Sequence, residues 1–192
     1  MQFLTKSLIA AALAGALATP AWSASLDFVP TTGAFAEGSS LNVDVVISGL
    51  AVGEQLSTFD LVVNFDPAHV GFSGYQLGGL LGDLALFESV DASAGSLAAG
   101  RFNLAQISFL ENLPMQPATF TLVTLTFSGL AAGQTALTFS DVTLGDKWGA
   151  PLAADIGSTL IDVTAVPEPG TPAMLLAGLG LLGLMARRRV QC

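Results

Sequence analysis

The sequence predicts that residues 24–164 form one all-β domain, a β-sandwich, and three observations lead to this prediction. Several segments alternate apolar and polar residues with a period of two, which is typical of half-buried strands. Turns that contain glycine or aspartate separate these segments at intervals of roughly 10 to 20 residues, as in sandwich folds. The region has almost no helical periodicity, and its length of about 141 residues is sufficient for one hydrophobic core.

The first predicted strands lie in the N-terminal half of the domain. Residues 41–47 alternate apolar and polar side chains except at Val46, and a glycine follows the segment. Residues 59–65 alternate in the same way and end at an Asp-Pro pair, which favours a turn. Residues 70–72 are expected to form a short continuation of this strand.

The next two predicted strands each contain an irregularity. Residues 100–109 predict a strand with Phe102, Leu104 and Gln106 on one side, and with Ile107 and Phe109 following a β-bulge. Residues 120–127 change phase by one residue, because Phe120 and Leu122 are followed directly by Val123, Leu125 and Phe127. This shift indicates a second β-bulge near Leu122.

The remaining elements complete the predicted sandwich. Residues 137–139 and 142–144 are expected to form a pair of strands, and residues 160–166 the last strand. The segment 77–100 is rich in Gly, Ala and Ser and is poorly periodic. It predicts a long connection that contains one short strand at residues 84–90.

The first 23 residues have the organisation of a secretory signal peptide, with a signal helix. Lys6 is the only charged residue before the domain, and residues 7–18 form an almost unbroken apolar run. Small residues at Ala21 and Ser23 provide the two positions that a signal peptidase recognises, with cleavage expected after Ser23. The alternative is a membrane-spanning helix, but the apolar run is shorter than the roughly 20 residues that a span requires.

The C-terminal segment, residues 165–192, combines three features. The sequence Val166-Pro167-Glu168-Pro169 leads into an apolar run at 173–186, and Arg187-Arg188-Arg189 follows it. As a hydrophobic helix, this run would extend about 21 Å, against a hydrocarbon core of about 30 Å. The arginines are expected to stay on the cytoplasmic side. The alternatives are a processing handle held transiently in the inner membrane and an ordinary tail anchor.

These C-terminal residues resemble the PEP-CTERM sorting tail of Gram-negative bacteria. The resemblance implies processing by an exosortase, an intramembrane cysteine protease. It also implies that the protein passes through an inner-membrane intermediate to the cell surface or the extracellular matrix. The family is typical of organisms that make exopolysaccharide or biofilm.

The composition of the domain limits its partners. Residues 24–164 contain 14 acidic residues and only two basic ones, Arg101 and Lys147, which gives a net charge of −12. Such a domain repels nucleic acid, whose binding depends on basic residues. It is also poorly suited to anionic lipid. The only cysteine, Cys192, lies outside the domain, which therefore has no disulfide.

The domain itself resembles cohesins. The resemblance is carried by residues 40–50 and 59–72, which are similar to the first cohesin strands, and by residues 121–127 and 136–144, which are similar to later ones. It implies a nine-stranded jelly-roll β-sandwich that is structurally related to some carbohydrate-binding modules.

The residue types of the domain argue against catalysis, because it has one His, one Lys and no Cys. His69 follows a turn and is predicted to be a solvated loop residue. No metal ligand set and no cofactor are predicted. The alternative is a calcium ion held by loop carboxylates, for which Asp141, Asp146 and Asp155 would have to converge at one end of the sandwich.

Two aromatic residues are candidate ligand contacts, namely Trp148 and Tyr75, the only Trp and Tyr of the domain. Exposed aromatic rings bind the apolar faces of sugars. For Trp148, the alternative is that the ring closes one end of the sandwich. The sequence therefore predicts a non-enzymatic surface or matrix protein with a structural or adhesive role. The alternative is a module that binds carbohydrate or another surface protein, associated with exopolysaccharide.

Overall fold

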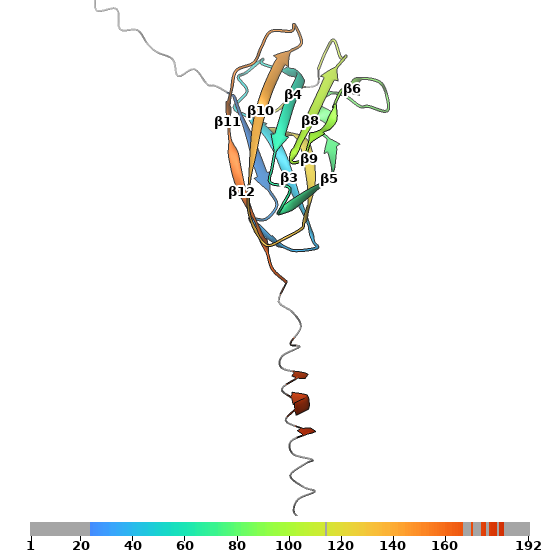
Figure 1. The fold of residues 1–192 in the computed structure, drawn as a ribbon. Helices are drawn as coiled ribbons and strands as arrows, with labels where there is room; N and C mark the ends of the chain where they lie inside the picture. The colour runs from blue at the N-terminus through green and yellow to red at the C-terminus, as the bar shows by residue number, and fades with distance from the viewer. Residues whose placement is uncertain are drawn as a thin grey trace, which may run out of the picture.

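The structure is a computed structural model that describes residues 24–113 and 115–166, together with residues 170, 174–175, 177–179 and 181–182 of the C-terminal segment. Twelve strands form two sheets that face each other, as predicted for an all-β sandwich (Figure 1). In the chain, one short 3₁₀-helix, η1 (Gly79–Leu81), lies between β5 and β6.

The first sheet has five strands in the order β11-β1-β3-β9-β5. The long members are antiparallel, while β11 runs parallel to β1 at the sheet edge. The strands are β1 (Ala24–Pro30), β3 (Ser40–Ser48), β5 (Val70–Leu77), β9 (Phe120–Gly129) and β11 (Ala154–Ile156).

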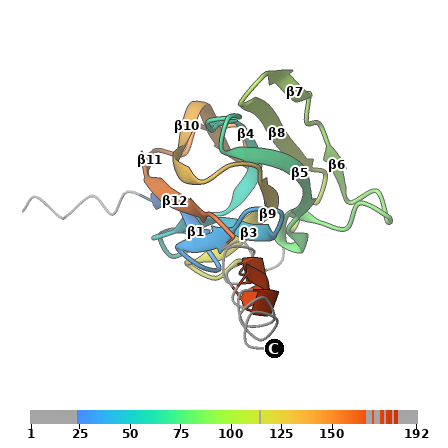
Figure 2. The ribbon, with the colours of Figure 1, turned by 60° about the horizontal axis from the view of Figure 1, so that its bottom comes forward.

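The second sheet has the order β2-β12-β10-β4-β8-β6, and β7 also pairs with β8. Figure 2 shows β6 and β7 at one side of the sandwich, next to β5 and β8. The strands are β2 (Ala34–Ala36), β4 (Leu56–Asn64), β6 (Ser89–Asp91), β7 (Gly95–Ala98), β8 (Arg101–Ser108), β10 (Gly133–Asp146) and β12 (Ser158–Thr164).

The core lies between the two sheets and consists of the inward-facing residue of each alternating pair. Strand β3 shows this alternation clearly, because its four residues Leu41, Val43, Val45 and Ile47 are buried while their neighbours are more exposed. Aromatic rings join the sheets: Phe72 of β5 stacks on Phe102 of β8 with ring centroids 3.8 Å apart. Because the two stacked rings come from different sheets, their contact holds the sheets together.

One of the two predicted bulges is confirmed. Strands β3 and β9 pair Val45 with Val123 and Val46 with Thr121, so Leu122 is the extra residue. The bulge places both Leu122 and Val123 in the core, at 1 % and 0 % exposure. The bulge predicted in residues 100–109 is wrong. Strand β8 pairs with β4 in continuous register, and Ile107 is exposed because it is on the outer face.

Residues 137–144 form part of one long strand, β10, rather than a pair of strands. A register shift between Ser140 and Thr143 explains the change of apolar phase that suggested two strands. Asp141 has φ 51° at this bulge, an unusual conformation for a residue other than glycine. In the segment 77–100, the predicted strand at 84–90 is replaced by a turn followed by β6, and the additional strand β7 follows.

A buried polar side chain is the main irregularity of the core. Gln106 of β8 is 0 % exposed, on the same inner face as Phe102 and Leu104, as predicted. Its Nε2 donates to Ser89 Oγ at 3.0 Å, and Ser89 Oγ donates to the carbonyl of Gly82 at 2.9 Å. Within the described part of the chain, Gln106 Oε1 has no hydrogen-bond partner.

We expect Gln106→Met to leave the stability unchanged or to raise it by about 1 kcal/mol. The change removes an unpaired buried acceptor, whose desolvation costs about 1–3 kcal/mol, and sacrifices one hydrogen bond of about 1 kcal/mol. Ser89 keeps its bond to Gly82. Urea unfolding followed by circular dichroism measures the change. A loss of more than about 1 kcal/mol would show that the Gln106 carbonyl is satisfied in solution.

Both ends of the chain carry predictions that fall largely outside the description. The signal peptide, including Ala21 and Ser23, lies outside the described residues. In the C-terminal apolar run, the seven described residues are helical. No helix among the described residues is long and apolar enough to cross a membrane.

Candidate functional site

Trp148 lies in a short, tightly hydrogen-bonded loop between β10 and β11. The carboxylate of Asp146 accepts bonds from the backbone N–H of Trp148 and of Ala150, both at 2.8 Å. The Asp146 N–H donates to the carbonyl of Ala150 at 2.9 Å, and Gly149 takes φ +77°, which suits glycine. This loop therefore holds Trp148 on a fixed backbone.

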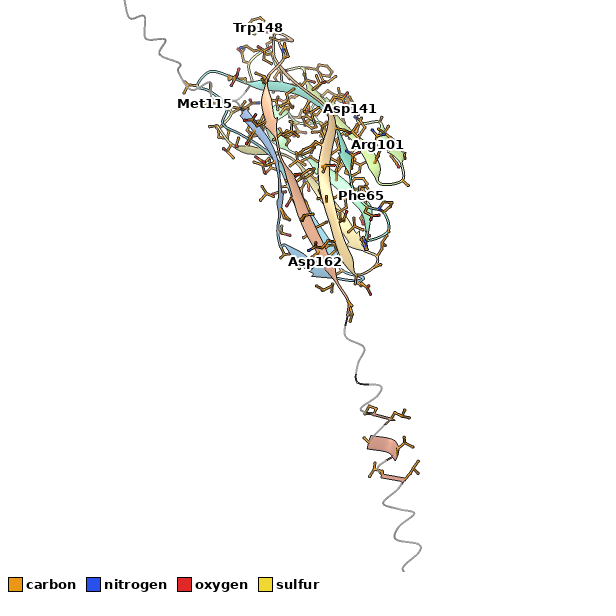
Figure 3. The ribbon with its side chains drawn as sticks, turned by 60° about the vertical axis from the view of Figure 1, so that its left-hand side comes forward. Phe65, Arg101, Met115, Asp141, Trp148 and Asp162 are labelled. Carbon is orange, nitrogen blue, oxygen red and sulfur yellow. The ribbon has the colours of Figure 1, made fainter. Side chains whose placement is uncertain are left out.

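The ring of Trp148 points into solvent at the end of the sandwich opposite Asp162, close to which the chain leaves the domain (Figure 3). Trp148 is 83 % exposed, so the alternative in which it closes the end of the sandwich is wrong. The Nζ of Lys147 lies over the ring, 5.2 Å from its centroid. This contact is a cation–π interaction, and it occupies one face of the indole.

Two shallow depressions meet at Lys147 and Trp148. The first has a volume of about 480 Å³ and is lined by the loop 51–55, with Asp146, Pro151 and Leu152. The second, of about 430 Å³, is lined by Leu110, Glu111 and Asn112. Three connections therefore form this end: β3–β4, β8–β9 and β10–β11. The sequence identified Trp148, but not the loops that meet it.

Tyr75, the second predicted contact, lies elsewhere, at the side of the sandwich. Its hydroxyl donates to Asp91 Oδ2 at 2.8 Å and joins β5 of one sheet to β6 of the other. Both residues line a groove of about 710 Å³ with Asp83 and Glu88. The two predicted aromatics line different depressions and do not form one site.

The surroundings of Tyr75 and Asp91 shift the pKa values of the two side chains in opposite directions. Burial is the largest influence on Tyr75 and raises its pKa. The hydrogen bond to Asp91 and the negative charge of Asp91 raise this pKa further. For Asp91, burial would raise the pKa, but hydrogen bonds from Ser93 and Tyr75 outweigh it and lower the pKa. At neutral pH, Asp91 is therefore an anion and Tyr75 a neutral hydrogen-bond donor. Their hydrogen bond connects the edge strands β5 and β6 of the two sheets.

Six large apolar side chains, here together called the corner patch, are exposed in the turn after Gly82 and at the adjacent ends of β6 and β8. Val90 and Ile107 are paired neighbours on the outer face of the sheet, and the N–H of Phe109 donates to the backbone carbonyl of Glu88 at 2.8 Å. Phe87 is 85 % exposed and has φ 57°. The members of the corner patch are Leu84, Leu86, Phe87, Val90, Ile107 and Phe109.

The turn that carries the corner patch is held by hydrogen bonds on both sides. Asp83 Oδ1 accepts from the N–H of Ala85 at 2.7 Å, and Glu88 Oε2 accepts from the N–H of Asp83 at 3.0 Å. The Glu88 N–H donates to the carbonyl of Asp83 at 3.0 Å. The turn therefore presents its apolar side chains with little freedom of the backbone. Sequence reasoning missed this patch because it assigned the residues to a strand.

A polar network covers the outer face of the same sheet beside the corner patch. Asn103 Nδ2 donates to Asp60 Oδ1 at 2.6 Å, and Arg101 Nε donates to Asn64 Oδ1 at 3.1 Å. Arg101 also lies 3.5 Å from the carboxylate of Asp141 (Figure 3). The outer face thus offers an apolar corner and an adjacent set of oriented amides and charges.

The candidates for catalysis and for metal binding do not assemble into a site. His69 is half-buried rather than solvated, and its ring leaves no room for a side chain at Gly133. The acids of the calcium alternative, Asp141, Asp146 and Asp155, form no joint ligand set. In the described residues, no group of three or more His, Cys, Asp or Glu side chains is placed to hold a metal ion.

The residues predicted for sorting lie mainly outside the description. Val166 is described and is exposed, just beyond the end of β12. Pro167, Glu168 and Pro169, and also Arg187, Arg188 and Arg189, lie outside the described residues.

Comparison with protein families identifies the tail. Residues 165–189 match the PEP-CTERM protein-sorting motif, so the chain carries the signal that the sequence predicted. This motif indicates export and exosortase-mediated sorting toward the surface of a Gram-negative cell. No curated protein matches the chain.

Comparison with solved structures identifies the fold as cohesin-like. The sixth cohesin of scaffoldin B from Acetivibrio cellulolyticus, solved in complex with a dockerin, superposes with a TM-score of 0.59 at 16 % identity, over 74 % of this chain and 99 % of that one. The cohesin module of a family 33 glycoside hydrolase from Clostridium perfringens gives a TM-score of 0.60 at 11 % identity, over 75 % and 97 %. A non-cellulosomal cohesin from the archaeon Archaeoglobus fulgidus gives 0.58 at 12 %, over 74 % and 91 %.

Proposed function

We propose that this chain is an exported, exosortase-sorted protein of the cell surface or extracellular matrix, and that its cohesin-like domain binds another protein. The role is structural or adhesive and involves no catalysis. A sorting motif and a cohesin-like fold are not enzymatic features, and similar domains include one solved in complex with a dockerin. The mature protein is expected to reside in the exopolysaccharide layer.

The corner patch is the observation that supports protein binding. Soluble monomers rarely expose contiguous clusters of large apolar side chains, and such clusters are typical of interaction sites. Phe87 combines 85 % exposure with a left-handed backbone conformation, which costs about 1–3 kcal/mol for a residue of this type. Neither exposure nor strain benefits the isolated domain, so both are explained by a partner that covers the ring.

The charges around the patch indicate the character of the partner surface. Asp83 and Glu88 flank the apolar turn and Asp91 follows Val90, whereas Arg101, the nearest basic residue in the sequence, is paired with Asp141. We therefore expect the partner to present an apolar pocket bordered by Lys or Arg. Complementary charges would accelerate association and select against acidic surfaces.

Phe87→Asn tests this function, because it separates stability from binding. Asparagine tolerates the left-handed conformation, so the variant is expected to be at least as stable as the parent chain. The ring of Phe87 is proposed to be buried in the complex. Its loss is expected to weaken partner binding by about 2 kcal/mol or more, which is about 30-fold. The partner is isolated from the extracellular fraction of the producing cells with the full-length protein, and the affinities are then measured by calorimetry with the purified partner.

Leu160→Asn is the matched control. Leu160 is also a large exposed apolar residue, but it is in β12, away from the corner patch. It should leave partner binding unchanged. Equal affinities for the parent chain and Phe87→Asn would exclude the corner patch as the binding surface.

A second candidate function is the binding of exopolysaccharide, and the exposure of Trp148 favours it. An indole ring held outward on a rigid loop is suited to the apolar face of a sugar ring. Its ligand would be a hydroxylated polymer, in contrast to the apolar protein pocket that is expected to cover the corner patch. The two surfaces are centred on different loops, but both include residues of the β8–β9 connection, because Phe109 belongs to the corner patch and residues 110–112 line a depression beside Trp148.

A further inference from the structure

We propose that the end of the sandwich around Trp148 is a binding site for an uncharged polysaccharide chain, which stacks on the indole and extends into the two depressions beside it. This inference rests on the second candidate function. It assigns that function to named residues and to one chemical class of ligand.

The indole provides one open face for a sugar ring. Lys147 lies over the other face, 5.2 Å from the ring centroid, and so restricts the orientation of the indole. The backbone bonds that Asp146 accepts hold the loop in position, at 2.8 Å each. A rigid aromatic side chain loses little conformational freedom on binding, which favours affinity. The site is therefore largely formed before the ligand arrives.

The depressions provide the polar groups that a glycan requires beside an aromatic surface. Gln55 and Glu54 border one of them, and Asn112 and Glu111 border the other. The first depression thus contains one amide and two carboxylates, because Asp146 also lines it, and the second contains one amide and one carboxylate. These groups bind sugar hydroxyls as donors and acceptors. Because the depressions meet at Trp148, a ligand that stacks on the ring is adjacent to both. A chain of several sugar units fits this arrangement better than a single one.

The local charges select an uncharged polymer. Glu54, Glu111 and Asp146 line the same two depressions as Lys147, which is the one basic residue of their lining, and the domain as a whole carries a net charge of −12. An anionic polysaccharide is repelled by this end of the domain. A polymer of neutral hexoses meets no such barrier and can use the carboxylates as hydrogen-bond acceptors.

The position of the site is suited to a polymer. Trp148 is at the opposite end of the domain from Asp162, near which the chain leads toward the sorting motif (Figure 3). A ligand at Trp148 is therefore far from the attachment of the tail. The site adjoins the corner patch at the β8–β9 connection, which supplies residues 110–112 to the site and Phe109 to the patch.

The test measures binding of the full-length protein, in mild detergent, to insoluble cellulose, curdlan and mannan, with alginate beads as the anionic probe. Depletion isotherms should show saturable binding to at least one uncharged polymer and none to alginate at low salt. Trp148→Ala is expected to weaken binding about tenfold or more, and Trp148→Phe to retain most of it. Gln55→Ala and Asn112→Ala should each weaken binding by a smaller factor. Leu160→Ala, at an exposed apolar position outside the site, should have no effect.

The outcomes separate the site from the function. Binding to an uncharged polymer that is unchanged in Trp148→Ala would overturn the assignment of the site and leave polysaccharide binding intact. Absence of binding to all three uncharged polymers would overturn both. Preferential binding to alginate would overturn the ligand class. Because Trp148 is exposed, its replacement is not expected to unfold the domain, and circular dichroism of each variant checks this directly.

Discussion

Replacement of Pro167, Glu168 and Pro169 by alanine is expected to leave a chain that still ends at Cys192, whereas the parent chain loses its C-terminal segment near these residues. Prolines favour an extended backbone and lack N–H donors, so we expect the sequence to be accessible to an enzyme at the membrane surface. Glu168 is the only charge between the domain and the apolar run, and offers a processing enzyme one specific contact. We expect the effect to be nearly complete, because we propose that these residues are the part of the sorting signal that the exosortase recognises.

Intact-mass analysis of the protein from cells with active sorting machinery measures this result. Pro172→Ala is the matched control, since it removes a proline from the same segment outside residues 166–169 and should leave processing unchanged. The apolar run contains three glycines, Gly178, Gly180 and Gly183. Glycines in a membrane helix allow close packing against other helices, as binding to an intramembrane protease would require. A mature parent protein that retains Cys192 in such cells would identify the segment as a permanent anchor.

The fold could be predicted largely because side-chain alternation is local. Strand β3 and the bulge at Leu122 are both visible in the order of apolar residues, because an extra residue in the strand keeps Leu122 and Val123 both in the core. The similar shift after Gln106 has another cause, an apolar Ile107 on the outer face. The strand β10 was divided incorrectly because its bulge depends on Asp141 in a left-handed conformation, which the sequence does not indicate. Strand β1 was missed although Leu26 and Phe28 alternate, because they directly follow the predicted signal peptide.

The candidate site was less predictable because exposure depends on tertiary structure. Trp148 could be found by its residue type, but whether it faced solvent or closed the sandwich depended on where three loops end. The corner patch could not be found at all. Leu84, Leu86 and Phe87 have the composition of a buried strand, and only the turn fixed by Asp83 and Glu88 brings them to the surface.

Phe102→Ala is expected to destabilise the domain by about 3–5 kcal/mol. Phe102 is 1 % exposed and stacks on Phe72 of the opposite sheet, and the ring of Phe65 lies 6.0 Å away. Its truncation removes this contact between the sheets and leaves a cavity that rigid strands cannot close. Since domains of this size are stable by about 5–15 kcal/mol, a large part of the total is expected to be lost. Urea unfolding followed by circular dichroism measures the change.

Phe109→Ala provides the comparison that gives this result its meaning. Phe109 follows the same strand, but it is 62 % exposed and belongs to the corner patch. Its removal should change the stability by less than about 0.5 kcal/mol, as for most surface substitutions, while it weakens partner binding. The two phenylalanines are thus expected to separate two roles: the inner face of β8 holds the sheets together, and the end of the strand is proposed to contact a partner. A cost below about 1 kcal/mol for Phe102→Ala would contradict the packing of the sheets through this stack, because a ring in that position cannot be removed at so small a loss.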